Sequence, residues 1–239
     1  MSLDVSAKWV PTAPLVRGPL VFARCWVLRL LVCAVLFWAV GNGAILGVNR
    51  LLSAQNPAPP PPADVAGLGH FEYIDAHLWR SAAPSATGYR ELAAAGVRTV
   101  IDLRDRDDPG LRRRADAQSV LPELGVRLVR IPVKDGRTPT AGQVAQFVAT
   151  VRGARGVVLV HCGAGVGRTG SMVAAYQVST GRLDGDDALK QSLAVGPPSL
   201  EQIAFMARLK QGDIDGPGLV ATVASRMLDA PRLLWGRLR

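Results

Sequence analysis

The order of hydrophobic and polar positions divides the chain into one long apolar block and, from about residue 70, segments that alternate between two periods. Short β-branched runs are typical of buried strands, whereas apolar residues at helical spacing indicate amphipathic helices. The strand-like segments lie at 71–82, 97–103, 126–133 and 156–161, and the helix-like segments at 84–96, 115–125, 140–153, 168–181, 184–196 and 199–212. Strands that alternate with helices favour parallel pairing, so we predict an α/β domain with a central, mostly parallel sheet flanked by helices.

Local signals mark the ends of two of these helices. Ser85 stands where a helix cap is expected, and Gly96 follows the same segment as a stop signal. Thr140 and Gln143 have the spacing of a capping box, in which each residue bonds the backbone of the other. We therefore predict that a helix begins directly after Thr140.

The apolar block covers residues 30–48, nineteen positions without a charge. That length is enough for a helix to cross the hydrocarbon of a bilayer. A buried core helix and the apolar part of a cleaved signal peptide are the alternatives. A signal peptide has a shorter apolar part and a short basic start, whereas here 29 residues precede the block and no A-x-A cleavage site follows. We predict a retained transmembrane helix.

Basic residues flank this block unequally, because four precede it and one follows it before Arg80: Lys8, Arg17, Arg24, Arg29 and Arg50. The bias predicts a single-pass topology with a cytoplasmic amino terminus and an extracytoplasmic folded domain. The expected organisation is a basic segment at 1–29, the transmembrane helix at 30–48, a proline-rich linker at 49–69, the folded domain at 70–216 and a basic amphipathic tail at 217–239.

The net charge of +9 sits mainly at the two ends of the chain. Residues 1–50 carry +4 and residues 217–239 carry +3, which leaves +2 for the folded part. Basic ends of this kind suit anionic lipid headgroups, and no zinc-finger spacing or interleaved aromatic pattern indicates a nucleic-acid partner. The tail is compatible with a membrane-surface helix or with a helix that packs on the domain.

Cys162 is the one cysteine of the folded part, since Cys25 and Cys33 lie beside and within the apolar block. No disulfide can therefore form inside the domain, and the thiol is free for chemistry. It opens the run "CGAGVGRTG" at 162–170, at the predicted end of a strand. Ligands of parallel sheets bind beyond the carboxyl ends of the strands, which makes this run the candidate site.

The composition of the run predicts a phosphate site. Backbone N–H groups of a glycine-rich loop that enters a helix can converge on one anion, aided by the helix dipole. A guanidinium can add two parallel hydrogen bonds to phosphate oxygens, which a lysine could not reproduce. We expect phosphate to be bound by Gly163, Ala164, Gly165, Val166, Gly167 and Arg168.

The same surroundings favour the thiolate of Cys162, which is then the candidate nucleophile. His161 is expected to support the loop, and the hydroxyl of Thr169 is expected to donate to the sulfur as it departs. Protonation of the leaving oxygen needs a carboxylic acid, for which Asp135 is our choice, because it lies on a loop with glycine and proline between a strand and a capped helix. The competing carboxylates, expected to lie on a solvated loop, are Asp105, Asp107 and Asp108.

These residues resemble a known family. The run "VHCGAGVGRTG" is similar to the signature of cysteine-dependent tyrosine and dual-specificity phosphatases, His-Cys-five residues-Arg-Ser/Thr, and the resemblance covers about residues 70–212. It implies a parallel-sheet α/β fold, a phosphocysteine intermediate, no metal or other cofactor, and an aspartate acid some thirty residues before the cysteine; Asp135 lies 27 before it. Related inositol-lipid phosphatases often carry lysines in this loop, where this chain has Gly163 and Val166, which weakens a polyphosphoinositide substrate.

The sequence thus predicts a phosphomonoester hydrolase, with a protein phosphotyrosine or phosphoserine/threonine as the substrate that the resemblance implies. A phospholipid or another envelope phosphate, such as phosphatidylglycerophosphate, is an alternative suggested by the apolar block and the basic ends. An inactive, membrane-tethered phosphate-binding module and a rhodanese-like sulfur transferase are alternatives of other classes. His70 and His77 lack metal-like neighbours in the sequence and are expected to be structural.

Overall fold

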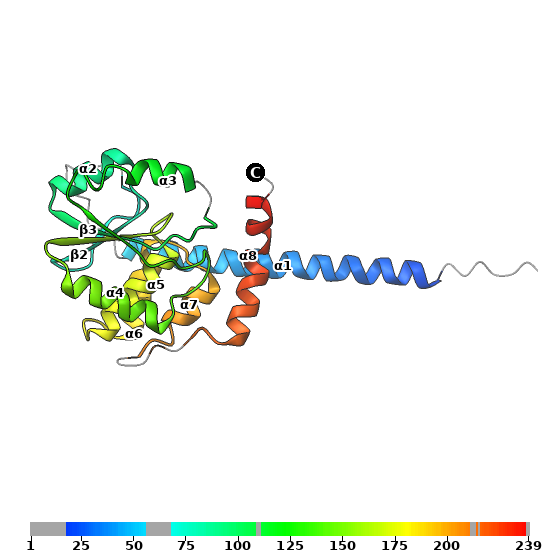
Figure 1. Cartoon of the computed structure of the whole chain (residues 1–239). Coiled ribbons are helices and arrows are strands. Elements are labelled where there is room, and N and C mark those ends of the chain that lie inside the picture. The colour runs from blue at the N-terminus through cyan, green and yellow to red at the C-terminus, as the bar shows by residue number, and fades with distance from the viewer. Residues whose placement is uncertain (1–17, 56–67, 109–110, 211–213, 215, 238–239) are drawn as a thin grey trace, which may run out of the picture. The chain divides into compact units, whose positions relative to one another are not determined.

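A computed structural model of the chain describes residues 18–55, 68–108, 111–210, 214 and 216–237. Two compact units divide at residue 40, namely Met1–Val40 and Gly41–Arg239. The second unit contains the sheet and its helices (Figure 1).

The first helix, α1, runs from Gly18 to Gln55 and contains the predicted span at 30–48. Its portion Trp26–Gln55 has a mean hydropathy of 2.1 and is, among the described residues, the one helix long and apolar enough to cross a membrane. None of its most apolar window is buried, which is unlike a buried core helix. A signal sequence near the amino terminus can also be long and apolar enough to meet this criterion, so α1 is compatible with a membrane anchor and with a signal sequence. The helix also includes the first residues of the predicted linker at 49–69, of which 56–67 lie outside the described residues.

Five strands form one sheet in the order β1-β2-β5-β3-β4. Their bounds are Glu72–Tyr73 for β1, Leu78–Ser81 for β2, Val97–Asp102 for β3, Arg127–Arg130 for β4 and Val157–His161 for β5. β1 and β2 form an antiparallel hairpin, whereas β2, β5, β3 and β4 pair in parallel. The predicted mostly parallel sheet is confirmed, and β5 lies between two parallel neighbours.

Helices cover both faces of the sheet, with α2 and α3 on one face and α4, α5, α6 and α7 on the other (Figure 1). Their bounds are Ala86–Ala94 for α2, Leu111–Gln118 for α3, Ala141–Gly153 for α4, Gly167–Ser179 for α5, Gly185–Val195 for α6 and Leu200–Met206 for α7. A further helix, α8, spans Leu219–Arg237 within the predicted tail.

Alternation along the central strand divides the core into two apolar clusters. Val158 and Val160 belong to the cluster that contains α4 and α5 residues such as Phe147, whereas Leu159 belongs to the cluster with Tyr89 of α2. All five side chains are almost fully buried. Burial on both faces explains why the sequence of β5 is a continuous apolar run.

The predicted caps form. Ser85 accepts a hydrogen bond from Gly88 N, and Thr140 and Gln143 make the full capping box at the start of α4. The segment predicted as a helix at 115–125 is different, because α3 ends at Gln118 and turns follow it. Pro122 explains the difference, since a proline disfavours helical backbone in the residue before it and lacks the N–H of a helical bond.

Candidate active site

The candidate site lies where β5 gives way to α5. β5 ends at His161 and α5 begins at Gly167, and we call residues 162–168 the phosphate loop. Cys162 directly follows the buried strand, and only 3% of its surface is exposed. The loop therefore joins the carboxyl end of a central parallel strand to the amino terminus of a helix, as the sequence predicted.

The phosphate loop needs glycine where its backbone lies close to neighbouring parts of the chain. Gly165 has a φ of +76°, and a Cβ there would lie 2.5 Å from backbone atoms of Ser81 and Ala82 at the end of β2. A Cβ on Gly167 would collide with the side-chain amide of Gln202 on α7. A larger residue is excluded at Gly165, whereas at Gly167 it would require the end of the Gln202 side chain to shift; the two glycines thus allow the loop to fit between β2 and α7.

Arg168 lies almost fully buried at the start of α5 and pairs with two carboxylates. Its Nη1 donates to Asp108 Oδ2 at 2.6 Å and to the carbonyl of Val133 at 3.2 Å, while its Nη2 lies 3.3 Å from Asp135 Oδ1. Burial lowers the pKa of Arg168, but the negative charges of Cys162, Asp108 and Asp135 outweigh it and raise the pKa above its ordinary value. The guanidinium therefore carries a permanent charge between the phosphate loop and the carboxylates.

The expectation that the carboxylates at 105–108 lie on a solvated loop is wrong for Asp108. Its side chain is 9% exposed and makes the shorter of the two ion pairs with Arg168. Arg106 and Asp107 beside it are exposed, as expected. The sequence signal was a carboxylate following a buried parallel strand, because the ends of β3 and β5 meet at the same edge of the sheet.

Asp135 lies on the segment between β4 and α4, and we call residues 134–139 the acid loop. Its side chain is 45% exposed, five times as much as that of Asp108. α7 holds the following residues of the loop: Ser199 Oγ donates to Gly136 O at 2.9 Å, and Gln202 Nε2 donates to Arg137 O at 2.9 Å. The acid loop is thus anchored on one side, next to an exposed carboxylate that points at Arg168.

His161 supports the phosphate loop from inside the core. The ring is fully buried, with Nδ1 3.0 Å from the carbonyl of Cys162 and Nε2 2.9 Å from the hydroxyl of Tyr89. A carbonyl can only accept, so Nδ1 carries the proton and Nε2 accepts from Tyr89. Burial lowers the pKa of His161 despite the opposing charge of Asp102, and burial raises the pKa of Tyr89 to about 12. The neutral ring therefore fixes the Cys162 carbonyl.

Thr169 is fully buried on the first turn of α5, and its hydroxyl has no hydrogen-bond partner among the described residues. The predicted hydrogen bond from Thr169 to the sulfur is not among those the structure contains. A buried hydroxyl without a partner carries a free-energy cost, which a donation to a developing thiolate would remove. The role of Thr169 stays a prediction.

Two further residues contact the phosphate loop, and sequence reasoning missed one of them, Arg80. Arg80 on β2 is fully buried and donates from Nη2 to the carbonyls of Gly165 and Val166. His70, expected to be structural, places Nδ1 2.7 Å from the carbonyl of Ala164 and has a φ of 53°. An arginine between apolar strand residues was the available signal for Arg80, because a buried charge needs a partner.

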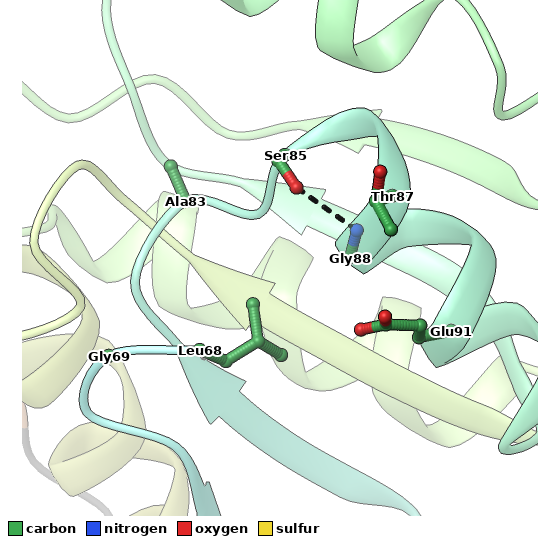
Figure 2. A pocket seen from close by; sticks show the side chains of 7 residues that line it. All are labelled: Leu68, Gly69, Ala83, Ser85, Thr87, Gly88 and Glu91. Carbon is green, nitrogen blue, oxygen red and sulfur yellow. Dashed lines mark hydrogen bonds between the residues drawn. The ribbon is translucent and has the colours of Figure 1, made fainter. Parts of the chain in front are cut away.

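A shallow pocket of about 270 Å³ opens beside the phosphate loop, between the segment before β1 and the start of α2 (Figure 2). Ser85 and Glu91 supply polar atoms to its wall. Ala83, also on the wall, donates its N–H to the carbonyl of Gly163 at 2.9 Å, which connects the pocket to the loop. No cluster of three or more metal-ligating side chains occurs among the described residues.

The lowered pKa of His161 predicts a pH dependence of stability. In the unfolded chain the imidazole has its ordinary pKa of 6.5, so below that pH the unfolded state takes up a proton that the folded state refuses. Stability is therefore lost as the pH falls through about 6.5, by up to about 1.4 kcal/mol per pH unit. In His161→Asn, whose amide can still donate to Cys162 O, this component of the slope disappears. Thermal denaturation of both proteins in detergent over a pH series measures it, and equal slopes would contradict the assignment.

The matching family model carries the description "DSP-PTPase phosphatase fused to NAD+ kinase" and covers residues 70–208. The dual specificity protein phosphatase TpbA of Pseudomonas aeruginosa is 29% identical over 206 residues, which are 84% of this chain and 85% of that protein. The probable chloroplastic NAD kinase 2 of Oryza sativa subsp. japonica is 31% identical over 109 residues, which are 44% of this chain. The chain spans only 11% of that rice protein.

Among solved structures, the core catalytic domain of the PP-IP phosphatase SIW14 from S. cerevisiae superposes with a TM-score of 0.50. The match covers 66% of this chain and 91% of that domain at 15% identity, a level at which the likeness concerns the fold. The family model spans more than half of the chain and includes the phosphate loop, the acid loop and all five strands. The chain belongs to this DSP-PTPase phosphatase family, as the signature around Cys162 indicated.

Proposed function

We propose that the protein hydrolyses phosphomonoesters through a phosphocysteine intermediate on Cys162. The observation that carries the proposal is the position of this buried cysteine at the strand-to-helix junction, in a glycine-dependent loop that ends in the charged Arg168. Membership of the phosphatase family supports it. A rhodanese-like sulfur transferase needs neither the second carboxylate on Arg168 nor an acid loop.

Substrate binding uses the outer edge of the Arg168 guanidinium. Nη1 already donates to Asp108 Oδ2 and to the Val133 carbonyl. Nη2 faces Asp135, which is the more exposed partner and can move aside for a phosphate oxygen. In this proposal the phosphate takes the place of Asp135 on Nη2, while Asp108 keeps the guanidinium oriented.

The reaction then has two displacement steps. In the first, the sulfur of Cys162 forms a bond to phosphorus as the ester P–O bond breaks, and Asp135 gives its proton to the leaving oxygen. In the second, Asp135 takes a proton from water, the water oxygen bonds to phosphorus, and the S–P bond breaks to release phosphate. The hydroxyl of Thr169 donates to the departing sulfur. The N–H groups of the phosphate loop bind the oxyanion in both steps.

Replacing the nucleophile provides the first test. In Cys162→Ser, hydrolysis of p-nitrophenyl phosphate should fall by about three orders of magnitude or more, because the alcohol is not ionised. Rapid acid quenching of the wild-type protein should trap phosphate on Cys162, detected by mass spectrometry. Wild-type turnover in the serine variant would contradict the mechanism, and absence of turnover in the wild-type chain would favour the inactive binding module.

The two carboxylates on Arg168 offer a matched pair of variants. Asp135→Asn should lower kcat by about 10²-fold to 10⁴-fold for a substrate with a poor leaving group, such as an alkyl phosphate. The loss should shrink for p-nitrophenyl phosphate, whose leaving group needs less protonation. Asp108→Asn should raise KM with both substrates and leave the leaving-group dependence unchanged. If Asp108→Asn instead produces the leaving-group dependence, the roles of the two carboxylates are reversed.

The substrate class proposed first is a phosphoprotein, phosphotyrosine or phosphoserine/threonine. This proposal follows the dual-specificity relatives, one of which covers most of the chain. The specific observation that favours a phospholipid is the exposed apolar portion Trp26–Gln55 of α1, together with basic ends. Turnover of phosphotyrosyl peptides should exceed that of phosphatidylglycerophosphate in vesicles by at least about tenfold in kcat/KM. Activity confined to the vesicles would reject the phosphoprotein and support the lipid.

We infer that α1 is a retained membrane anchor with a cytoplasmic amino terminus, which places the domain outside the cytoplasm. The apolar portion of α1 and the excess of basic residues before it support this topology. The proposed boundaries remain 1–29, 30–48, 49–69, 70–216 and 217–239. A reporter enzyme that is active only outside the cytoplasm, fused after Arg239, tests the orientation. Recovery of the chain shortened at its amino terminus would instead identify a cleaved signal.

A further inference from the structure

We propose that Arg80 is a positioning residue of the phosphate loop, which it shapes from the side of β2 and supplies with a second buried positive charge. The inference rests on the proposed function. Arg80 pairs with Val160 in the register of β2 and β5, two residues before Cys162. Its side chain is fully buried, and Nη2 donates to Gly165 O at 2.8 Å and to Val166 O at 3.4 Å.

These two hydrogen bonds help to orient two of the loop's N–H groups. A trans peptide unit is planar, so its carbonyl and the N–H of the next residue point in opposite directions. When Arg80 holds the Gly165 carbonyl on its own side, the N–H of Val166 is turned the other way. The Val166 carbonyl also accepts from Gly170 N at 2.7 Å, and the longer bond from Arg80 supports the same orientation for the N–H of Gly167. Arg80 thereby helps to aim two donors of the phosphate loop at a common point.

The charge of Arg80 is only partly compensated. Its nearest carboxylate oxygen is Glu72 Oε2, 3.7 Å from Nη1, and Glu72 also accepts from Gln191 at 2.5 Å. Arg80 Nε and Nη1 have no hydrogen-bond partner among the described residues. A buried guanidinium so incompletely bonded is costly for stability alone. Its retention in an apolar strand is explained if the charge serves the site.

The thiol of Cys162 is the second group that interacts with this charge. Burial lowers the pKa of Arg80, while the negative charges of Glu72 and Cys162 act in the opposite direction. Electrostatic attraction is mutual, so the Arg80 cation also attracts negative charge at the sulfur. The phosphate dianion that binds above the sulfur experiences the same field. Arg80 and Arg168 thus provide positive charge on two sides of the loop.

The experiment uses the full chain in detergent, with Cys25→Ser and Cys33→Ser in every protein so that iodoacetamide alkylation reports on Cys162 alone. Arg80→Lys keeps a charge but cannot hold two carbonyls with a rigid fork. Arg80→Met combined with Glu72→Gln removes both buried charges, a change that is often tolerated by the fold. Arg98→Met is the matched control, because Arg98 also donates to two backbone carbonyls, of Ala93 and Val97, at the opposite end of the sheet.

In Arg80→Met/Glu72→Gln, the concentration of inorganic phosphate that protects Cys162 from alkylation should rise at least about tenfold. One buried cation is lost, and two N–H donors of the phosphate loop lose the bonds that help to orient them. The alkylation rate at a fixed pH, without phosphate, should also fall, because a buried cation on the sulfur's side of the loop is lost. Arg80→Lys should keep most of this rate and lose phosphate affinity. Arg98→Met should match the parent protein in both readouts. Melting temperatures establish that the compared proteins are folded.

Unchanged phosphate protection and unchanged alkylation in the folded double variant would overturn the proposal. If the double variant does not fold, Arg80→Lys decides, and parental phosphate affinity in that variant would overturn it. Neither readout requires turnover. A failure of the proposed function, seen as absent hydrolysis by the parent protein, is therefore distinguishable from a failure of the role given to Arg80.

Discussion

The contact between the phosphate loop and the end of β2 is the constraint on which the site depends. Gly165 lies so close to the backbone of Ser81 and Ala82 that a single methyl group would collide with it. β2 is hydrogen-bonded to β5 along its whole length, so the same pairing brings this backbone and Cys162 to one edge of the sheet. The loop is therefore shaped by the sheet, and the position of the sulfur follows from strand register.

Charge balance around Arg168 is the second organising feature. Two carboxylates and a cysteine surround one guanidinium, and the carboxylates differ fivefold in side-chain exposure. That difference gives them different tasks in the proposed mechanism, because the buried Asp108 can only orient while the exposed Asp135 can move. Two hydrogen bonds from α7 hold the residues that directly follow Asp135.

The fold and much of the candidate site could be predicted from the sequence, for reasons that lie in local patterns. The β-branched run at 157–161, the capping box at Thr140 and the run from Cys162 to Gly170 are each readable within a few residues. Asp108 and Arg80 could not be assigned in this way, because their partners lie 60 and about 85 positions further along the chain. In the sequence alone, an aspartate-rich loop is typical of a solvated surface loop, and an arginine in a strand indicates no particular partner. Their contacts with Arg168 and Gly165 arise only when the strands pair in the parallel sheet.

The solitary thiol of the folded domain has a consequence for oxidation. The proposed mechanism requires Cys162 to react as a thiolate. A thiolate reacts with peroxide to give a sulfenic acid, which many proteins protect by forming a disulfide with a neighbouring cysteine. The segment 70–216 has no second cysteine with which Cys162 could form that bond. Recovery from oxidation therefore depends on a small thiol or a reductase arriving from outside, and prolonged exposure to oxidant leads to irreversible sulfinic acid.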